Sequence, residues 1–218
     1  MGFLEKRAKH KEEFRREILD SAREIFINDG YDGFSMRKLA GKIGYCPTTI
    51  YLYFKNKDDL LFAICEEFFA NFFAELNRIR SVSQDPIETL RQAFLYLVEF
   101  GLKNPNQYKL IFFTKSVYGT RQEWVEKESM ARNTYFVFKE IVQDCIDAGK
   151  LREIDVDTIV SMLSVTSHGV TAKNIYCADF AKERSEIVAH TLVNVLVSGL
   201  QKYIPLHLTA SPSSREQE

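Results

Sequence analysis

Basic side chains without acidic neighbours set one short stretch of the sequence apart. Residues 34–57 include five Lys or Arg and neither Asp nor Glu, although the whole chain has a net charge of −1. A cluster of cations that excludes carboxylates is suited to bind phosphate groups. This stretch therefore predicts a polyanion partner, with double-stranded DNA as the first candidate. Its basic residues are Arg37, Lys38, Lys42, Lys55 and Lys57.

Two short helices on either side of a glycine are predicted to position these side chains. Ser35 is a candidate N-cap of the first helix, and Gly44 can end it. Pro47 fits the first turn of the second helix, where its missing N–H costs nothing. The pair makes a helix-turn-helix over about 35–54, whose second helix can lie in the major groove of DNA.

Charge is distributed unevenly along the chain. Residues 1–57 carry 12 basic and 8 acidic side chains, whereas residues 58–218 carry 17 basic and 22 acidic ones. We therefore expect a basic DNA-binding head over 1–57 and a larger acidic body over 58–204. Residues 205–218 are polar and are expected to form a disordered tail.

Helical periodicity runs through nearly the whole chain and predicts an all-α fold of about nine helices. The first helix is amphipathic and should end at Asp29-Gly30, where glycine can adopt a left-handed conformation. The helices after the helix-turn-helix are expected over about 57–80, 85–103, from Asn104 onward, 122–149, 155–177 and 179–203.

The sequence Ile50-Tyr-Leu-Tyr-Phe-Lys-Asn-Lys-Asp-Asp-Leu60 is the most specific motif of the chain. Together with Asp29-Gly30-Tyr31 and Ser35-Met-Arg-Lys-Leu-Ala40, it resembles the DNA-binding head of the tetracycline-repressor (TetR) family over about residues 12–62. This resemblance implies a transcriptional regulator, most often a ligand-responsive repressor that binds a near-palindromic operator as a homodimer.

The resemblance also implies roles for particular residues of the head. Ser35, Tyr51, Tyr53 and Lys57 match positions that contact the phosphate backbone. The front of the second helix matches positions that face base edges or nearby backbone. With the neighbouring cations, the expected DNA-binding set is Ser35, Arg37, Lys38, Tyr45, Pro47, Thr48, Thr49, Tyr51, Tyr53, Lys55 and Lys57.

The start of the second helix of the helix-turn-helix departs from the family pattern at two positions. Cys46 stands where many members have a Ser cap, and Thr48 stands where many have Gly or Ala. No Arg, Asn or Gln lies between Tyr45 and Phe54, so readout should depend on Thr hydroxyls, methyl contacts and DNA shape. Cys46 is open to two interpretations, a redox sensor or a small tolerated residue.

The body is rich in aromatic residues, with 16 between Phe62 and Phe138. They predict either a cavity for a small apolar or aromatic effector or ordinary core packing. His168 lies in a segment, 164–170, that resembles a histidine-glycine stretch of some family members, and it is either a cavity residue or a buried histidine. The candidate lining residues are Phe69, Phe73, Tyr108, Phe112, Trp124, Tyr135 and His168.

The family resemblance implies that the last two helices pair with those of a second subunit. An effector that favours a conformation with the wrong spacing of the two heads would then weaken DNA binding, through the fourth helix. The candidate dimer contacts are Ile159, Leu163, Val188, Leu192, Val195 and Leu196.

No catalytic, metal or cofactor motif is visible, so we expect neither an enzyme nor a bound cofactor. Glu186 and His190 share a helix face but lack the further ligands that a metal site needs. The alternatives are an all-α enzyme and an adaptor with a vestigial helix-turn-helix. The four cysteines show no paired spacing, and no signal peptide or membrane span is present, so a soluble cytoplasmic protein is expected.

Overall fold

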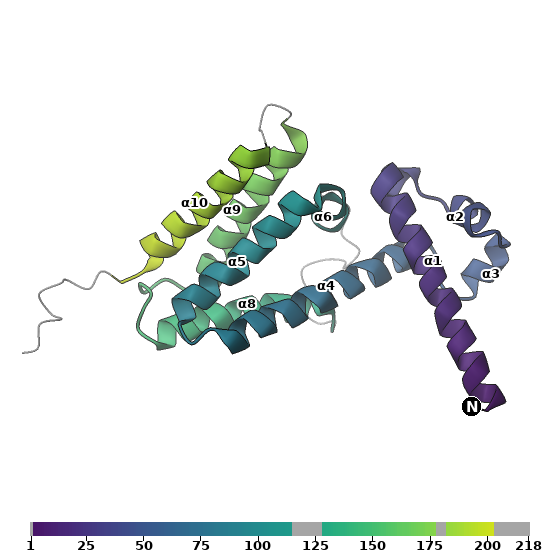
Figure 1. The fold of residues 1–218 in the computed structure, drawn as a ribbon, viewed down its shortest axis with the longest axis horizontal. Coiled ribbons are helices and arrows are strands. Elements are labelled where there is room, and N and C mark those ends of the chain that lie inside the picture. Colours follow the sequence, from purple (N-terminus) through teal and green to yellow (C-terminus); the bar gives the residue numbers. More distant parts are fainter. Residues whose placement is uncertain (1, 115–127, 178–181, 203–218) are drawn as a thin grey trace, which may run out of the picture.

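The computed structural model describes residues 2–114, 128–177 and 182–202. Within these ranges the chain forms nine α-helices and no β-strand, so the prediction of an all-α fold is confirmed (Figure 1). None of the described helices combines the length and apolar character that a membrane span requires. The helices are α1 (Phe3–Gly33), α2 (Met36–Ile43), α3 (Pro47–Tyr51), α4 (Lys57–Val82), α5 (Pro86–Lys103), α6 (Pro105–Phe112), α8 (Met130–Asp147), α9 (Val156–Tyr176) and α10 (Lys182–Leu200).

The helix-turn-helix forms where the capping residues predict it. The Ser35 hydroxyl accepts a hydrogen bond from the Lys38 backbone N–H at 3.1 Å, which satisfies one of the free donors at the start of α2. Gly44 ends α2 with φ +73°, a left-handed conformation that glycine adopts without strain. Gly30 also has a positive φ, +72°, and breaks the regularity of α1 there, although one further turn extends the helix to Gly33.

The head is built on its own apolar core. α1 contributes one face of this core, α2 covers it with three buried side chains and α3 with one, and the N-terminal half of α4 completes it. One buried member, Leu110, comes from α6 in the body of the protein. The side chains from the first three helices include Phe14, Ile18, Ala22, Phe26, Leu39, Ala40 and Ile50.

Helix α4 connects the head to the body and runs along both (Figure 1). Its N-terminus is capped by Asn56, whose side-chain oxygen accepts a hydrogen bond from the Asp59 N–H at 2.9 Å. At the other end, Arg80 pairs with Asp144 at 2.8 Å and also contacts Glu140, both on α8. Caps and ion pairs therefore fix α4 at its two ends.

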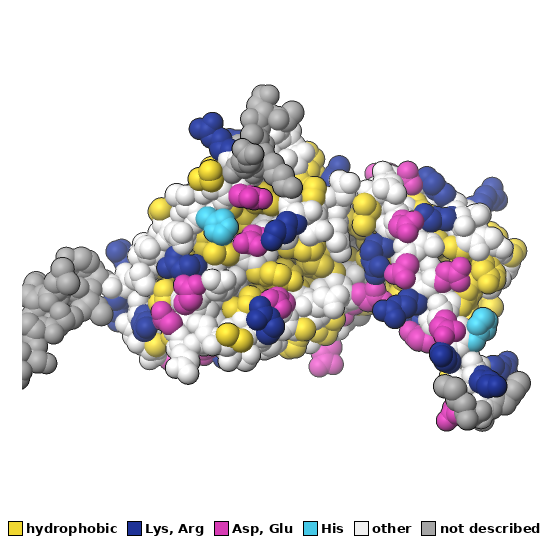
Figure 2. All heavy atoms as spheres, in the orientation of Figure 1, with side chains coloured by type: hydrophobic (Ala, Val, Ile, Leu, Met, Phe, Trp, Pro, Cys, Tyr) yellow, Lys and Arg dark blue, Asp and Glu magenta, His cyan; other side chains and the backbone are white. Residues whose placement is uncertain are grey.

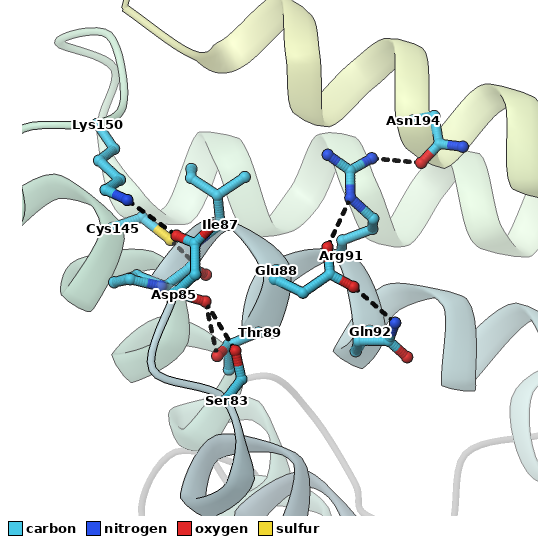
Figure 3. Close-up of polar contacts among 11 residues, drawn as sticks. Ser83, Asp85, Ile87, Glu88, Thr89, Arg91, Gln92, Cys145, Lys150 and Asn194 are labelled. Carbon is cyan, nitrogen blue, oxygen red and sulfur yellow. Dashed lines mark hydrogen bonds and ion pairs between the residues drawn. The ribbon is translucent and has the colours of Figure 1, made fainter.

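The body packs α4, α5, α6, α8, α9 and α10 around a second apolar core. Polar contacts join the N-terminal half of α5 to its neighbours (Figure 3). Asp85 accepts from the Lys150 ammonium at 2.9 Å, and the Cys145 thiol donates to the Pro86 carbonyl at 3.1 Å. Arg91 donates to Asn194 of α10, so α5 is tied to both α8 and α10.

One predicted helix begins later than the sequence pattern indicates. The helix expected from Gln122 starts at Met130, because residues 128 and 129 are not helical and Ser129 caps the new N-terminus. The Ser129 hydroxyl accepts from the Arg132 N–H at 3.1 Å. Residues 122–127 and the expected tail over 205–218 lie outside the described residues.

Gly101 in α5 allows close packing against α9. A Cβ atom at this position would lie 2.5 Å from Thr171 Cγ2, and Thr171 is a fully buried β-branched residue that cannot swing away. We expect Gly101→Ala to lower the free energy of unfolding by about 1–3 kcal/mol, measured by urea denaturation. Gly199→Ala in α10 is the control, because its Cβ would meet no atom within 4 Å; equal effects of the two changes would contradict this packing.

Candidate nucleic-acid interface and effector cavity

The turn between α2 and α3 presents the predicted DNA-binding residues on the outside of the head. The Tyr45 N–H donates to the Ala40 carbonyl at 3.0 Å, which folds the chain back directly after Gly44. The exposed members of the set are Ser35, Arg37, Lys38, Tyr45, Thr48, Tyr51 and Lys55, and the half-buried ones are Pro47, Thr49, Tyr53 and Lys57. Their contacts with DNA stay predictions.

Two of the predicted tyrosines are positioned by α1. The ring of Tyr45 lies 4.5 Å from the ring of Phe14, and the ring of Tyr53 lies 5.2 Å from it on an edge-to-face geometry. Such aromatic pairs hold side chains in one orientation. Phe14 therefore positions two residues of the predicted DNA-binding set. The sequence pattern shows only that Phe14 faces inward and does not reveal this role.

The stretch without acidic residues is not free of acidic neighbours in space. Lys38 pairs with Asp29 of α1 at 2.8 Å, and Lys42 pairs with Glu24 of the same helix. Figure 2 shows that acidic and basic side chains alternate over the visible face of the head. Of the five cations in residues 34–57, Arg37 and Lys55 have exposed side chains for which the described residues provide no acidic partner, so they are the most available to phosphate within this stretch.

The half-buried side chain of Lys57 lies against Tyr31, near the end of α1. Its ammonium lies 3.8 Å from the centre of the Tyr31 ring and 3.5 Å from the Tyr31 carbonyl oxygen. The Tyr31 hydroxyl in turn donates to Asp58, and this bond with burial raises the Tyr31 pKa to about 12. Lys57 is thus placed by the end of α1, and a phosphate contact would compete with a cation–π interaction.

Cys46 leaves the N-terminus of α3 without a side-chain cap. Its sulfur lies 2.9 Å from the Thr48 hydroxyl, and this hydrogen bond lowers the pKa of the thiol. Pro47 removes one of the free N–H donors at this helix start. The structure therefore confirms the prediction that the N-terminus of α3 is weakly capped.

A cavity of about 470 Å³ lies in the body, between α4, α5, α6, α8 and α9. Four of the residues that the sequence suggested line it: Phe69, Phe112, Tyr135 and His168. Their binding of an effector stays a prediction. Its other lining residues are Leu61, Cys65, Phe72, Phe94, Leu97, Leu110, Ile111, Thr114, Ala131, Thr134, Phe138, Val160, Ser161, Ser164 and Val165.

Three suggested lining residues are not part of the described wall. Phe73 packs against the body core instead, and Tyr108 is completely buried behind His168. Trp124 lies outside the described residues. Helical spacing showed that Phe73 and Tyr108 face inward, but it did not distinguish the core from the cavity wall.

Five cavity residues also belong to the head core or pack against it. Leu61 and Cys65 of α4 and Leu110 of α6 are buried in that core, and Phe69 and Ile111 pack against it. Burial raises the pKa of the Cys65 thiol to about 12, so it stays protonated and behaves as an apolar residue. No sequence motif marks these residues, since aliphatic side chains at helical spacing are typical of any core.

The expected dimer contacts divide into three groups, one of which, Val188 and Leu196, is half-buried against the body core. Ile159 and Leu163 are 0% and 1% exposed in the body core, so the prediction that they contact a second subunit is wrong for this structure. Val195 is 62% exposed, and Leu192 is also exposed. Further exposed apolar side chains of α9 and α10 are Met162, Val165 and Ile187.

The pair Glu186 and His190 does not build a metal site among the residues with described positions. His190 Nε2 instead lies 3.5 Å from Glu99 Oε1 on α5. No group of three His, Cys, Asp or Glu suited to a metal ion occurs within the described ranges.

Comparisons with known proteins show which protein family the head resembles. Residues 18–64 match the family described as bacterial regulatory proteins, tetR family. An HTH-type transcriptional regulator of Haemophilus influenzae is 32% identical over 95 residues, which are 44% of this chain and 51% of that protein. The fatty acid metabolism regulator protein of Bacillus subtilis is 37% identical over 60 residues, 28% of this chain and 31% of that protein.

The fold extends this similarity beyond the head. The transcriptional regulator FadR from Bacillus subtilis, solved in complex with stearoyl-CoA, aligns with a TM-score of 0.71 over 85% of this chain and 98% of that chain, at 22% identity. By contrast, the sequence matches span about half the length or less of the curated relatives. The comparisons therefore identify a helix-turn-helix head of the tetR type on an all-α body. The head matches the tetR family over residues 18–64, and the fold of the described chain is similar to that of a solved TetR-family transcriptional regulator from Haemophilus influenzae.

Ser35 allows its capping role to be separated from a phosphate contact. Ser35→Ala removes the cap of α2 and should lower the free energy of unfolding by about 1 kcal/mol. Ser35→Asp keeps a capping oxygen and should fold as stably as the wild type, yet bind DNA at least about tenfold more weakly because carboxylate and phosphate repel. Urea denaturation and a mobility-shift titration measure the two quantities.

Ser198→Ala is the matched control, since Ser198 is exposed on α10 and caps no helix. It should change neither quantity. Full DNA affinity in Ser35→Asp would contradict a phosphate at this position.

Proposed function

We propose that this protein is a ligand-responsive transcriptional repressor that binds a near-palindromic operator as a homodimer. The observation that carries the proposal is the set of five residues shared by the head core and the cavity wall: Leu61, Cys65, Phe69, Leu110 and Ile111. A molecule that fills the cavity touches the side chains on which the DNA-binding head is packed. Occupancy of the body can therefore change the orientation of the head.

Two helices, α4 and α6, connect the head core to the cavity in the body, and they are held in different ways. α4 is continuous from the head into the body, and Arg23 of α1 pairs with Glu67 at its middle. α6 is a short helix that follows α5 after Asn104 and places Leu110 in the head core. Because packed cores shift between discrete arrangements, a displacement of α6 by an effector would repack the head. A coupling free energy of ~1–3 kcal/mol would change DNA affinity by roughly 5–150-fold.

The cavity wall supports an apolar effector. Aromatic and aliphatic side chains make up most of it, and no Asp, Glu, Lys or Arg occurs among the described lining residues. Burial of apolar surface is then the main source of affinity. The similarity of fold to FadR, which was solved with an acyl-CoA, is compatible with an effector that has an apolar chain.

The outer face of α9 and α10 supports pairing with a second copy. Ser161, Met162, Val165 and Leu196 line a shallow groove there, and Val195, next to Leu196 in α10, is exposed. Exposed apolar side chains gathered on one face are typical of protein interfaces. Two-fold pairing would set the two recognition helices about one DNA turn (~34 Å) or a multiple apart.

DNA binding is tested on the region upstream of the protein's own gene. Lys55 is exposed without an acidic partner in the described part of the chain. Lys55→Ala should weaken binding and reduce the slope of log affinity against log salt by about one, as expected for one lost phosphate contact. Lys103→Ala, on the body, should leave the slope unchanged. An unchanged slope in Lys55→Ala would remove Lys55 from the interface, and absence of binding to this DNA at low salt would contradict the proposed function.

The dimer surface is tested with two valines of similar exposure. Val195→Glu places a charge on the α10 face and should convert the dimer to monomers in sedimentation velocity. Val82→Glu, at the far end of α4 and 71% exposed, should leave the dimer intact. A dimer that survives Val195→Glu would place the interface elsewhere.

A further inference from the structure

The first third of α1 extends beyond the part of the helix that packs in the head. α1 begins at Phe3, whereas the first of its side chains in the head core is Phe14. Every residue from Glu5 to Glu13 is exposed, and this end of α1 projects away from the other helices of the head (Figure 1). We call residues 3–13 the N-terminal arm. At 1.5 Å per residue, it adds about 16 Å to the length of the head.

The local sequence supports a helix in the arm without help from tertiary packing. Residues 5–13 are Glu, Lys, Arg and Ala apart from His10, and these four types have high helix propensity. The Glu5 side chain accepts from the Gly2 N–H at 2.7 Å, and Lys9 pairs with Glu13 one turn later at 3.8 Å. The packed part of α1 supplies the helix nucleus, so each further residue adds a hydrogen bond without a new nucleation cost. The arm therefore continues α1 in the same direction.

One face of the arm continues the face of α1 that packs against the helix-turn-helix. Arg7, His10 and Lys11 lie seven, four and three positions before Phe14, and residues with these spacings share one side of an α-helix. The ring of Phe14 lies 4.5 Å from the ring of Tyr45, a member of the predicted DNA-binding set. We call Arg7, His10 and Lys11 the arm face. It begins beside the predicted DNA-binding surface and extends it outward.

The arm face is basic, and acidic residues of the arm lie on the opposite side. Glu12 is two positions from Phe14 and seven positions from Glu5, so both carboxylates are about half a turn away from the arm face. Within the described ranges, neither Arg7 nor Lys11 has an acidic partner. A phosphate group that approaches the arm face therefore meets cations without a competing carboxylate.

We propose that the arm face contacts the phosphate backbone of DNA beside the base pairs that α3 faces. The inference rests on the proposed function, because it requires the head to lie on DNA, and it adds a contact surface outside the helix-turn-helix. The length of the arm, about 16 Å, is close to the rise of about five base pairs of DNA. Ala8 is the only apolar residue between positions 5 and 13, so the arm suits a charged backbone better than a lipid layer.

Two lysines on different sides of the arm test this proposal. Lys11 belongs to the arm face, whereas Lys9 is two positions away, on the opposite side, and both are exposed. Affinity for the DNA upstream of the protein's own gene is measured by fluorescence anisotropy over a range of salt concentrations. Lys11→Ala should reduce the slope of log affinity against log salt by about one for each bound subunit. Lys9→Ala, the matched control, should leave the slope unchanged.

A double variant and a footprint locate the contact. Arg7→Ala combined with Lys11→Ala should reduce the slope by about two for each bound subunit, one for each lost phosphate contact. In hydroxyl-radical footprinting, the double variant should lose protection at a few backbone positions that Lys55→Ala leaves protected. Because the arm lies outside the head core, both variants should melt at the wild-type temperature in circular dichroism.

The outcomes separate this proposal from the proposed function. If Lys55→Ala reduces the slope but the double variant does not, the arm face makes no DNA contact and the proposal is wrong, although the helix-turn-helix still binds. Equal losses in Lys9→Ala and Lys11→Ala would also overturn it, because they would reflect net charge and not one face of the helix. If the wild type does not bind this DNA at low salt, the proposed function fails, and the proposal for the arm fails with it.

Discussion

The shared packing of α4 and α6 between two apolar cores is the constraint on which the rest of this structure depends. Leu61 and Leu110 are buried in the head core and also line the cavity of the body. Most two-part proteins keep their cores separate, so that events in one part need not alter the other. Here a single layer of side chains separates the place where a small molecule can bind from the frame that orients α3. In the proposed function, this geometry would couple effector binding in the body directly to DNA binding by the head.

Contacts with α1 also determine which cations of the head are available to bind phosphate. The cations of residues 34–57 are not equivalent, because α1 supplies Asp29 and Glu24 to two of them and Tyr31 to a third. Exposed ion pairs contribute little stability, so DNA phosphate can compete for these lysines at small cost. Arg37 and Lys55 need no such exchange. The positive charge available to a phosphate is thus smaller than the composition of the stretch suggests, and the position of α1 partly determines it.

Local signals in the sequence predicted the helices well. Ser35, Gly44, Asn56 and the prolines that open α3, α5 and α6 each mark a boundary that the structure contains, because capping depends on residues within one turn. The start at Met130 was missed, since a continuing periodicity concealed the cap at Ser129. The buried Ile159 and Leu163 were assigned to the wrong surface for a related reason. α9 is apolar on two faces, and periodicity does not say which face meets the body core.

The sequence by itself determined the all-α class, the position of the helix-turn-helix and the family of this head, because caps, turns and the 50–60 motif act over a few residues. Tertiary structure alone decided which inward-facing side chains form the cavity, which lysines α1 neutralises, and how Phe14 positions Tyr45. These relations join residues that are 9 to 107 positions apart, as Lys38 and Asp29 or Leu61 and His168 are. Helical periodicity records only that a side chain faces inward. What it meets there is decided by how the helices pack.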